Sequence, residues 1–294
     1  MPSTKRLVWL TLRLAFAVGA LFTFAMNVAR LNAGEHPVPE SPLWLTYSGE
    51  TGPGVGKHIV LIAADQEYRS EYSMPMLARL LAKHHGFHCT VLFSLNKDNE
   101  VDPTQKIRWE DKSITHNIPG LEHLEKCDFV ILFSRLLSLP PEQLQHIYNY
   151  LDSGKPIIGI RTANHGFIEF DYKKDGHLPE GCLPLVNGQP LLGRNHDDAI
   201  NPELIPLPVA WVKTWTGNTA HTARVFNLTM GSAQNFKSEG VRRMTVNAVY
   251  WCQHMESHID AQSCMDIVGE YNPPDSGFAY KELNISPRMP SFYK

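Results

Sequence analysis

Cysteine is scarce in this sequence: the chain has five cysteines in 294 residues, and no two of them stand close together. This excludes the paired spacing of a zinc ribbon and the motif of a thiol–disulfide enzyme. Cys89 and Cys127 flank expected strands, so we interpret them as small buried hydrophobic side chains. Cys182, Cys252 and Cys264 could form one disulfide in an exported protein, and nothing in the sequence selects the pair.

The chain also lacks an excess of charge of either sign. Its formal net charge is −3, and lysine and arginine are spread along the whole sequence. Nucleic-acid binding needs a concentrated basic surface, so we expect no nucleic-acid partner. Charged residues make up 19% and apolar residues 43% of the chain, which excludes a disordered protein and a multi-span membrane protein. The length fits one large domain or two small ones, and there is no internal repeat.

Only one long hydrophobic run is present, and it lies at the N-terminus. Lys5 and Arg6 precede a largely apolar stretch, residues 7–28, and Ala33 precedes a polar segment. Residues 1–33 are therefore predicted to be a signal peptide or, if uncleaved, a membrane anchor through residues 7–29. We accordingly expect an exported protein, periplasmic or extracellular, that touches a membrane only through this segment. Residues 34–56 are rich in proline and glycine, and we expect a linker there.

Three short apolar runs each stop at a polar cluster that contains an arginine. The pairs of run and cluster are 59–63 with 65–69, 129–133 with 134–135, and 156–160 with 161–165. Continuous apolar runs of this length are typical of strands buried on both faces of a parallel sheet. Ligands of such sheets bind at the carboxyl ends of the strands. We therefore predict that Arg69, Arg135 and Arg161 converge on one site.

Helical spacing alternates with these strands. It predicts helices over residues 73–85, 141–153 and 236–251, the last with Arg242 and Arg243 facing outward, and further strands at 89–94 and 223–229. This order favours an α/β fold with a doubly wound, mostly parallel sheet flanked by helices, as in flavodoxin-like proteins. The α/β domain is expected to span residues 57–255. The proline-rich tail, residues 256–294, is expected to wrap around the domain without a core of its own.

The turn at residues 159–163 has the form of a nucleophile elbow, but its exposed position holds Arg161. Arginine stays protonated and only donates hydrogen bonds, so it would bind a carboxylate, a phosphate or an oxyanion instead. Thr162 beside it has a hydroxyl group that His165 could activate, which is the weaker alternative. The arginines could also pair with Asp65 or Glu67 in a buried ionic network without a ligand.

Metal and aromatic sites are less well defined by the sequence. Asp65, Glu67, His165, His177 and residues 196–198 include suitable ligand types, but none has a specific metal-binding spacing. We expect no metal and no cofactor. Trp211 and Trp215 bracket Lys213 in an alternating run, and either core packing or stacking on a sugar ring would explain them.

Several motifs, in this order, resemble the trehalose-utilisation (ThuA-like) family, and more specifically its exported branch. They are residues 65–69, 117–121, 159–165, 208–211, 224–226, 230–231, 239–240 and 247–251. The resemblance implies the fold of class I glutamine amidotransferases. It also implies that the amidotransferase nucleophile position falls on Arg161 and that residues 230–232 replace the partner histidine, so no amidotransferase activity is expected. The family's relatives carry a longer insert where this chain has only residues 166–177.

The resemblance suggests a sugar or keto-sugar as the ligand. We expect Glu67 or His165 to act as the base of an enolisation or elimination, with Arg69 and Arg161 stabilising the developing oxyanion. The candidate substrate-binding residues are Asp65, Tyr68, Arg69, Arg135, Arg161, Thr162 and Trp215. A non-catalytic carbohydrate-binding or scaffold domain is one alternative, and a metal-assisted hydrolase is another.

Overall fold

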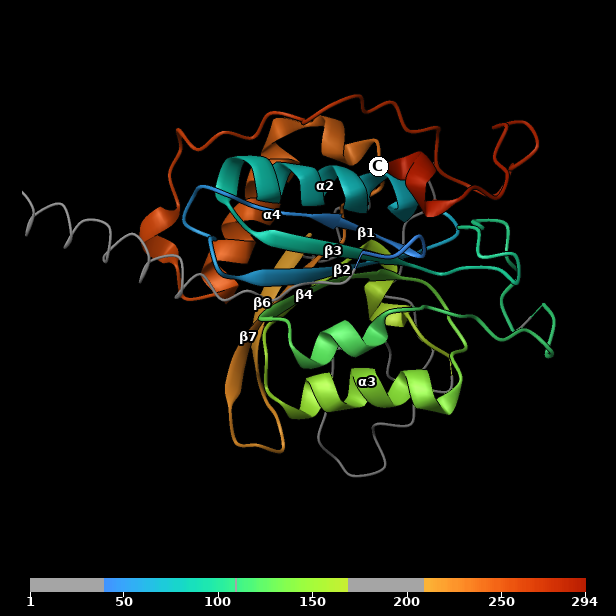
Figure 1. The fold of residues 1–294 in the computed structure, drawn as a ribbon, viewed down its shortest axis with the longest axis horizontal. Coiled ribbons are helices and arrows are strands. Elements are labelled where there is room, and N and C mark those ends of the chain that lie inside the picture. Colours follow the sequence, from blue (N-terminus) through green and yellow to red (C-terminus); the bar gives the residue numbers. More distant parts are fainter. Residues whose placement is uncertain (1–39, 109, 169–208) are drawn as a thin grey trace, which may run out of the picture. The chain divides into compact units, whose positions relative to one another are not determined.

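A computed structural model describes residues 40–108, 110–168 and 209–294 (Figure 1). These residues belong to one compact unit. The predicted leader, residues 1–33, lies outside the described residues, as do Cys182 and the candidate metal ligands His177 and residues 196–198. Among the described residues, no helix combines the length and apolar character needed to cross a membrane.

The fold is α/β, as predicted, and its centre is a mixed sheet of seven strands in the part of the chain described. The strands are β1 (Trp44–Tyr47), β2 (His58–Ala64), β3 (His88–Phe93), β4 (Phe129–Ser134), β5 (Ile157–Ile160), β6 (Ala210–Thr216) and β7 (Thr222–Leu228). Their order is β1-β3-β2-β4-β5-β7-β6. The five inner strands are parallel, and β1 and β6 pair antiparallel with β3 and β7 at the two edges.

Within the described residues, three α-helices cover the two faces of this sheet (Figure 1). They are α2 (Ser70–His85), α3 (Pro141–Asp152) and α4 (Glu239–Cys252). Ile59 and Leu61 of β2 pack into the same core cluster as the buried residues of α2 and α4. Val60 and Ile62 point to the opposite face and join the cluster that contains the buried residues of α3. Alternate residues of the apolar runs thus fill two cores, which explains why the runs show no polar interruptions.

The first helix begins earlier than the sequence indicated. We predicted a start at Ser73 with Pro75 in the first turn, whereas α2 starts at Ser70 and contains Pro75 within it. Ser70 is buried, and its Oγ accepts a hydrogen bond from the backbone N–H of Asp65 at 2.9 Å. This contact fixes Ser70 in the first turn, and Arg69 before it adopts a left-handed conformation as the N-cap residue.

The segment expected as a linker supplies an edge strand. β1 lies within residues 34–56 and pairs in antiparallel register with β3, with Leu45 buried in the core. β6 is the corresponding edge strand on the other side, and its alternating burial accounts for the spacing of Trp211 and Trp215. Neither strand carries the continuous apolar run of a central strand, because an edge strand can leave one face partly in water.

The C-terminal tail packs over α2 and α4 (Figure 1). Met265 and Tyr293 of the tail are buried in the core cluster of the domain. The prediction that Arg242 faces outward was wrong: its guanidinium is buried and donates to the carbonyl oxygens of Met265 and Phe236, both at 2.7 Å. Helical periodicity places Arg242 on a polar face of α4, and the tail then covers that face.

All four cysteines that the structure describes are free thiols. Cys89, Cys127 and Cys252 are buried, as expected of Cys89 and Cys127, and Cys264 is exposed. Burial raises the pKa of Cys127 and of Cys252 to about 12, so these two thiols are unreactive near neutral pH.

Candidate functional site

The topology brings the predicted site residues to the carboxyl edge of the sheet. From β2 the chain turns through α2 to β3 on one side, and it then crosses to β4 on the other side of β2. The order of strands therefore reverses between β2 and β4, which is where open α/β sheets bind their ligands. The polar clusters follow β2, β4 and β5, three neighbouring strands.

Backbone conformation at this edge is unusual. Arg69, Leu136 and Arg161 each have a positive φ, at 62°, 49° and 54°. They follow the ends of β2, β4 and β5 respectively, and Arg161 comes directly after its strand. A side chain in the left-handed region costs about 1–3 kcal/mol, and such strain is concentrated at functional sites. These three turns support this edge as the candidate site but do not single it out, because Ala220 and His254 at the opposite edge also have a positive φ.

Asp65 is a buried hub that joins two of these turns. Its carboxylate accepts from Thr162 Oγ1 at 2.6 Å, from the Glu67 backbone N–H at 2.8 Å and from the Tyr68 backbone N–H. Burial raises the pKa of Asp65, and these hydrogen bonds and the Arg135 charge act in the opposite direction. Because the Thr162 hydroxyl donates to Asp65, the pair serves to tie the β2 turn to the β5 turn.

Glu67 and Arg135 form an ion pair across the point of reversal. Arg135 Nε lies 3.3 Å from Glu67 Oε2, and both side chains are largely buried. The guanidinium of Arg135 also lies over the ring of Phe278 from the tail, 4.9 Å from its centroid. This pair matches the ionic network that the sequence left open, and it fixes Arg135 beside an aromatic ring.

Arg161 has a different environment. Its guanidinium stacks on the ring of Tyr68 at 4.1 Å and donates to the Thr229 carbonyl oxygen at 2.9 Å. Burial raises the pKa of Tyr68, so its hydroxyl stays protonated at neutral pH. The stacked arrangement leaves Arg161 half-buried at the predicted position, next to the elements that carry Glu67 and Arg135.

His165 lies near both of these arginines. Burial, and then the positive charges of Arg135 and Arg161, lower the pKa of His165 to about 4. Its imidazole is therefore neutral at pH 7 and able to accept a proton, although an imidazolium between two guanidinium groups is disfavoured. An anion bound between the two arginines would offset part of their positive charge and so raise the pKa of His165.

The neutral state of His165 has a measurable consequence for stability. Between pH 6.5 and 4 the unfolded chain binds a proton at this residue that the folded protein does not bind, so stability falls as the pH is lowered through this range. The free energy of unfolding in urea, measured at pH 7 and at pH 4.5, should fall between these two values by roughly 2 kcal/mol less in His165→Gln than in the unmodified protein. The exposed His221→Gln is the control. Parallel pH profiles for His165→Gln and the unmodified protein would contradict the expectation.

Two predicted residues do not join the cluster. Arg69 is 0% exposed. It donates to the carbonyl oxygens of Gln66 and Asp275 at 3.1 Å and to that of Gly277, so its guanidinium holds the tail against the β2 turn. Trp215 is buried in the core cluster on the α3 side and donates from Nε1 to the Leu151 carbonyl oxygen at 2.8 Å. Core packing, the alternative to sugar stacking, accounts for Trp215.

A cavity of about 530 Å³ opens at the same edge. It is lined by Gln66 after β2, Arg135 after β4, the loop residues 104–107 and 110 after β3, and Phe278 and Tyr280 of the tail. Phe278 is 50% exposed, and Gln66 is 4% exposed with no hydrogen-bond partner for its Oε1 atom. An unpartnered buried acceptor is unfavourable, so a ligand that donates a hydrogen bond there would be stabilised.

Sequence reasoning missed the aromatic part of this cavity. Phe278 and Tyr280 lie in the proline-rich tail, which was predicted only to wrap around the domain. Gln66 was part of the cluster after β2 but gave no signal of its own. The alternation of Phe278 and Tyr280 was the one available indication of an aromatic surface.

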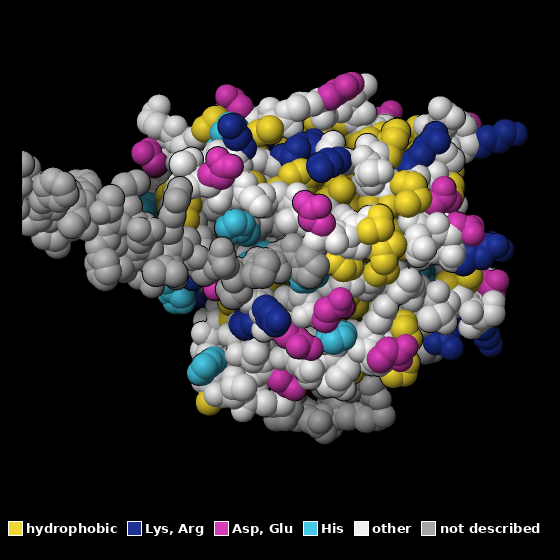
Figure 2. All heavy atoms as spheres, in the orientation of Figure 1, with side chains coloured by type: hydrophobic (Ala, Val, Ile, Leu, Met, Phe, Trp, Pro, Cys, Tyr) yellow, Lys and Arg dark blue, Asp and Glu magenta, His cyan; other side chains and the backbone are white. Residues whose placement is uncertain are grey.

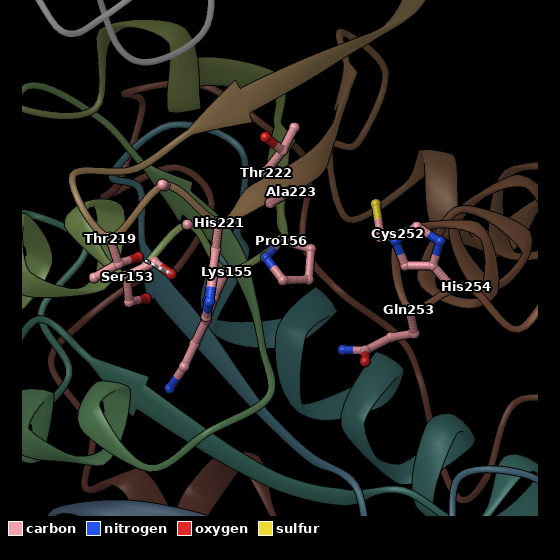
Figure 3. A pocket seen from close by; sticks show the side chains of 12 residues that line it. Ser153, Lys155, Pro156, Thr219, His221, Thr222, Ala223, Cys252, Gln253 and His254 are labelled. Carbon is pink, nitrogen blue, oxygen red and sulfur yellow. Dashed lines mark hydrogen bonds between the residues drawn. The ribbon is translucent and has the colours of Figure 1, made fainter.

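A second hollow, of about 730 Å³, lies at the opposite edge of the sheet (Figure 3). Pro156 before β5, Thr222 at the start of β7 and His254 after α4 line it, together with Lys155. Lys155 donates to the carbonyl oxygens of Glu125 and Cys127 and so is already bound. None of the predicted site residues lines this hollow, and we do not assign it a ligand.

Two further observations concern metals and surface charge. Within residues 40–108, 110–168 and 209–294, no group of three or more His, Cys, Asp or Glu side chains is placed to hold a metal ion. On the face drawn in Figure 2, basic and acidic side chains are interspersed and do not gather by sign.

The site thus belongs to an α/β protein with a polar, arginine-containing pocket at its point of strand reversal. No family model matches the chain, and no curated protein or solved structure matches it.

Proposed function

We propose that this protein binds a sugar or keto-sugar in the cavity between Gln66, Arg135 and Phe278. The observation that carries the proposal is the composition of that cavity: a half-exposed aromatic ring beside side chains that donate and accept hydrogen bonds. Sugars present apolar C–H faces ringed by hydroxyl groups, so an aromatic platform with polar side chains at its rim is complementary to them. The volume of about 530 Å³ is in the range of small-molecule sites.

The hydrogen-bonding groups of the cavity support a polyhydroxylated ligand. Gln66 offers an unpartnered buried acceptor. Gln105 is held in position, because its Oε1 accepts from Ser94 Oγ at 3.0 Å. Arg135 presents a guanidinium that Glu67 and Phe278 fix in place. Prepositioned groups lose little entropy on binding, which favours recognition of a ligand as polar as a sugar.

The first test measures the binding of a panel of neutral sugars and keto-sugars by isothermal titration calorimetry. We expect Phe278→Ala to weaken binding at least about tenfold, because it removes the stacking surface. Phe292→Ala is the matched control, since Phe292 is an equally exposed tail phenylalanine outside this cavity. No binding of any sugar at millimolar concentrations, or equal weakening by both variants, would refute the proposal.

A catalytic role is proposed for the neighbouring groups. Glu67 would take the proton from the carbon next to the carbonyl of a keto-sugar, while Arg135 and Arg161 stabilise the developing oxyanion. Glu67 is the first candidate for the base because it lies beside Arg135, which would stabilise the oxyanion, and His165 stays the alternative base. Arg161 stands where an amidotransferase nucleophile would be and offers only donors, so the proposal includes no amidotransferase activity.

Glu67→Gln tests catalysis separately from binding. The variant keeps the shape of the side chain and loses the base, so turnover of a bound keto-sugar should fall at least about a hundredfold with the Kd little changed. The assay uses NMR to measure how fast the α-proton of the keto-sugar is replaced by deuterium from deuterated water. Glu142→Gln, an exposed glutamate on α3, is the control. Unchanged exchange in Glu67→Gln would remove Glu67 as the base.

A non-catalytic carbohydrate-binding domain is the second candidate. It is favoured by the ion pair between Glu67 and Arg135, since a paired carboxylate is less available as a base. Sugar binding without any proton exchange would select this candidate. The metal-assisted hydrolase predicts loss of activity on chelation, and full activity in excess chelator would exclude it.

Membership of the ThuA-like family and export belong to the same proposal. The motifs at residues 65–69 and 159–165 support it, since they form the two turns that Asp65 and Thr162 join. Export is tested by expressing the full chain in bacterial cells and determining the N-terminal residue of the recovered protein. Cleavage near Ala33 would agree with a signal peptide, and an intact chain in the cytoplasm would contradict export.

A further inference from the structure

Glu71 is a buried carboxylate without a partner. It lies in the first turn of α2 and is 2% exposed, and neither of its carboxylate oxygens has a hydrogen-bond partner on another residue. The positive charge of Arg69 acts on Glu71, but its guanidinium donates to backbone carbonyl oxygens instead. Burying a carboxylate in this way is unfavourable by several kcal/mol, so Glu71 is a group that a cationic ligand would stabilise.

Glu71 lines a second cavity of about 530 Å³, formed by the start of α2 and the tail. Its wall contains none of the residues that line the proposed sugar cavity. Glu71, Pro273 and Tyr293 form the buried part, and Lys237, Asp275 and Arg288 lie at the exposed rim. The polar or aromatic lining residues are Glu71, Tyr72, Lys237, Asn272, Asp275, Asn284, Ser286, Arg288, Phe292 and Tyr293.

Charges of both signs line this cavity without pairing. Glu71 and Asp275 are acidic, whereas Lys237 and Arg288 are basic. Among the described residues, none of the ion pairs involves any of these four. Arg288 instead lies over the ring of Phe292 at 5.4 Å. A cavity with unpaired acidic and basic side chains is complementary to a ligand that carries one charge of each sign.

We propose that this cavity binds a small zwitterion of the amino-acid class, with its ammonium group at Glu71 and its carboxylate at Arg288 and Lys237. An ammonium group has three donors and can satisfy both oxygens of Glu71. The Tyr72 and Tyr293 rings, 5.2 Å apart and perpendicular, provide aromatic faces that favour a cation nearby. Arginine binds carboxylates through paired hydrogen bonds, which accounts for the opposite end of the ligand.

The ligand is not expected to be a metal ion. Two carboxylates, Glu71 and Asp275, line the cavity, and the described residues contain no group of three potential ligands. Ca²⁺ takes six to eight oxygen ligands in protein sites. A metal ion would also leave Lys237 and Arg288 facing a like charge.

The experiment titrates the protein with the proteinogenic amino acids by calorimetry, alongside N-acetylated and amidated derivatives and Ca²⁺. We expect at least one free amino acid to bind, its N-acetyl derivative not to bind, and Glu71→Gln to weaken it by about tenfold or more. Arg288→Gln should weaken the free amino acid but not its amide. The proposal is overturned if no amino acid binds at millimolar concentrations. It is also overturned if Glu71→Gln leaves the affinity unchanged, or if Ca²⁺ gives the same heat of binding as the amino acid.

Proton release gives a readout that loss of packing would not produce. Burial raises the pKa of Glu71 to about 7, so part of the protein carries a proton there at neutral pH. An ammonium group would expel that proton, and the binding enthalpy should then depend on the ionisation enthalpy of the buffer in the unmodified protein but not in Glu71→Gln. The Phe278→Ala variant should bind the amino acid normally, which separates this cavity from the sugar site.

Discussion

Arg69→Ala is expected to lower the free energy of unfolding by at least about 4 kcal/mol. The guanidinium is fully buried, and it is the donor for the carbonyl oxygens of Gln66, Asp275 and Gly277. Hydrogen bonds to a charged group contribute about 1.5–3 kcal/mol each, and the variant leaves the carbonyl groups without their donor. The tail would also lose its fixation at the β2 turn. Urea unfolding gives the stability, and limited proteolysis reports release of the tail.

Two further variants serve as comparisons for Arg69→Ala. Arg69→Lys keeps the charge but cannot make the same set of bonds, so we expect it to recover less than half of the loss. Lys57→Ala removes one partner of a partly exposed ion pair with Asp128 and should change stability by less than about 1 kcal/mol. If Arg69→Ala is as stable as Lys57→Ala, then Arg69 does not hold the tail, and its assignment as a structural residue fails.

Glu71→Gln is expected to change how stability depends on pH. Burial raises the pKa of Glu71 from 4.5 to about 7. Between these values the folded protein keeps a proton at Glu71 that the unfolded chain has released, so ionisation lowers stability as the pH rises. Glutamine resembles the protonated carboxyl group and has no such loss. The variant should therefore match the unmodified protein near pH 4.5 and exceed its stability by about 3 kcal/mol at pH 7.5.

The measurement is the difference in free energy of unfolding between variant and unmodified protein across this pH range. The difference isolates Glu71, because His85 and His165, whose pKa values burial lowers to about 4, contribute equally to both proteins. Glu142→Gln is the matched control, since Glu142 is the exposed glutamate in the first turn of α3. A difference that stays constant with pH, or one that is smaller at pH 7.5 than at pH 4.5, would show that Glu71 is not the buried acid described.

Local patterns determined the central architecture. The apolar runs predicted inner strands, including β2, where all seven residues are buried and only His58 is polar, because a strand covered on both faces favours apolar side chains throughout. The carboxyl-end rule for parallel sheets predicted that Arg69, Arg135 and Arg161 meet at one edge, and Arg69 instead holds the tail. Burial and strand direction depend on short stretches of chain, and such stretches are visible in the sequence.

Partner choice required the tertiary structure. Arg69 and Arg161 look alike in sequence, because each stands in a polar cluster after a strand. In the fold, however, Arg69 donates a hydrogen bond to a carbonyl oxygen 206 residues away, whereas Arg161 stacks on the ring of Tyr68. Trp215 and Arg242 likewise took their roles from elements packed against them, α3 and the tail. The cavities that contain Phe278 and Glu71 exist only because the tail lies over the β2 turn and α2. Periodicity specifies which side chains leave water, but contacts between distant segments decide what each of them meets there.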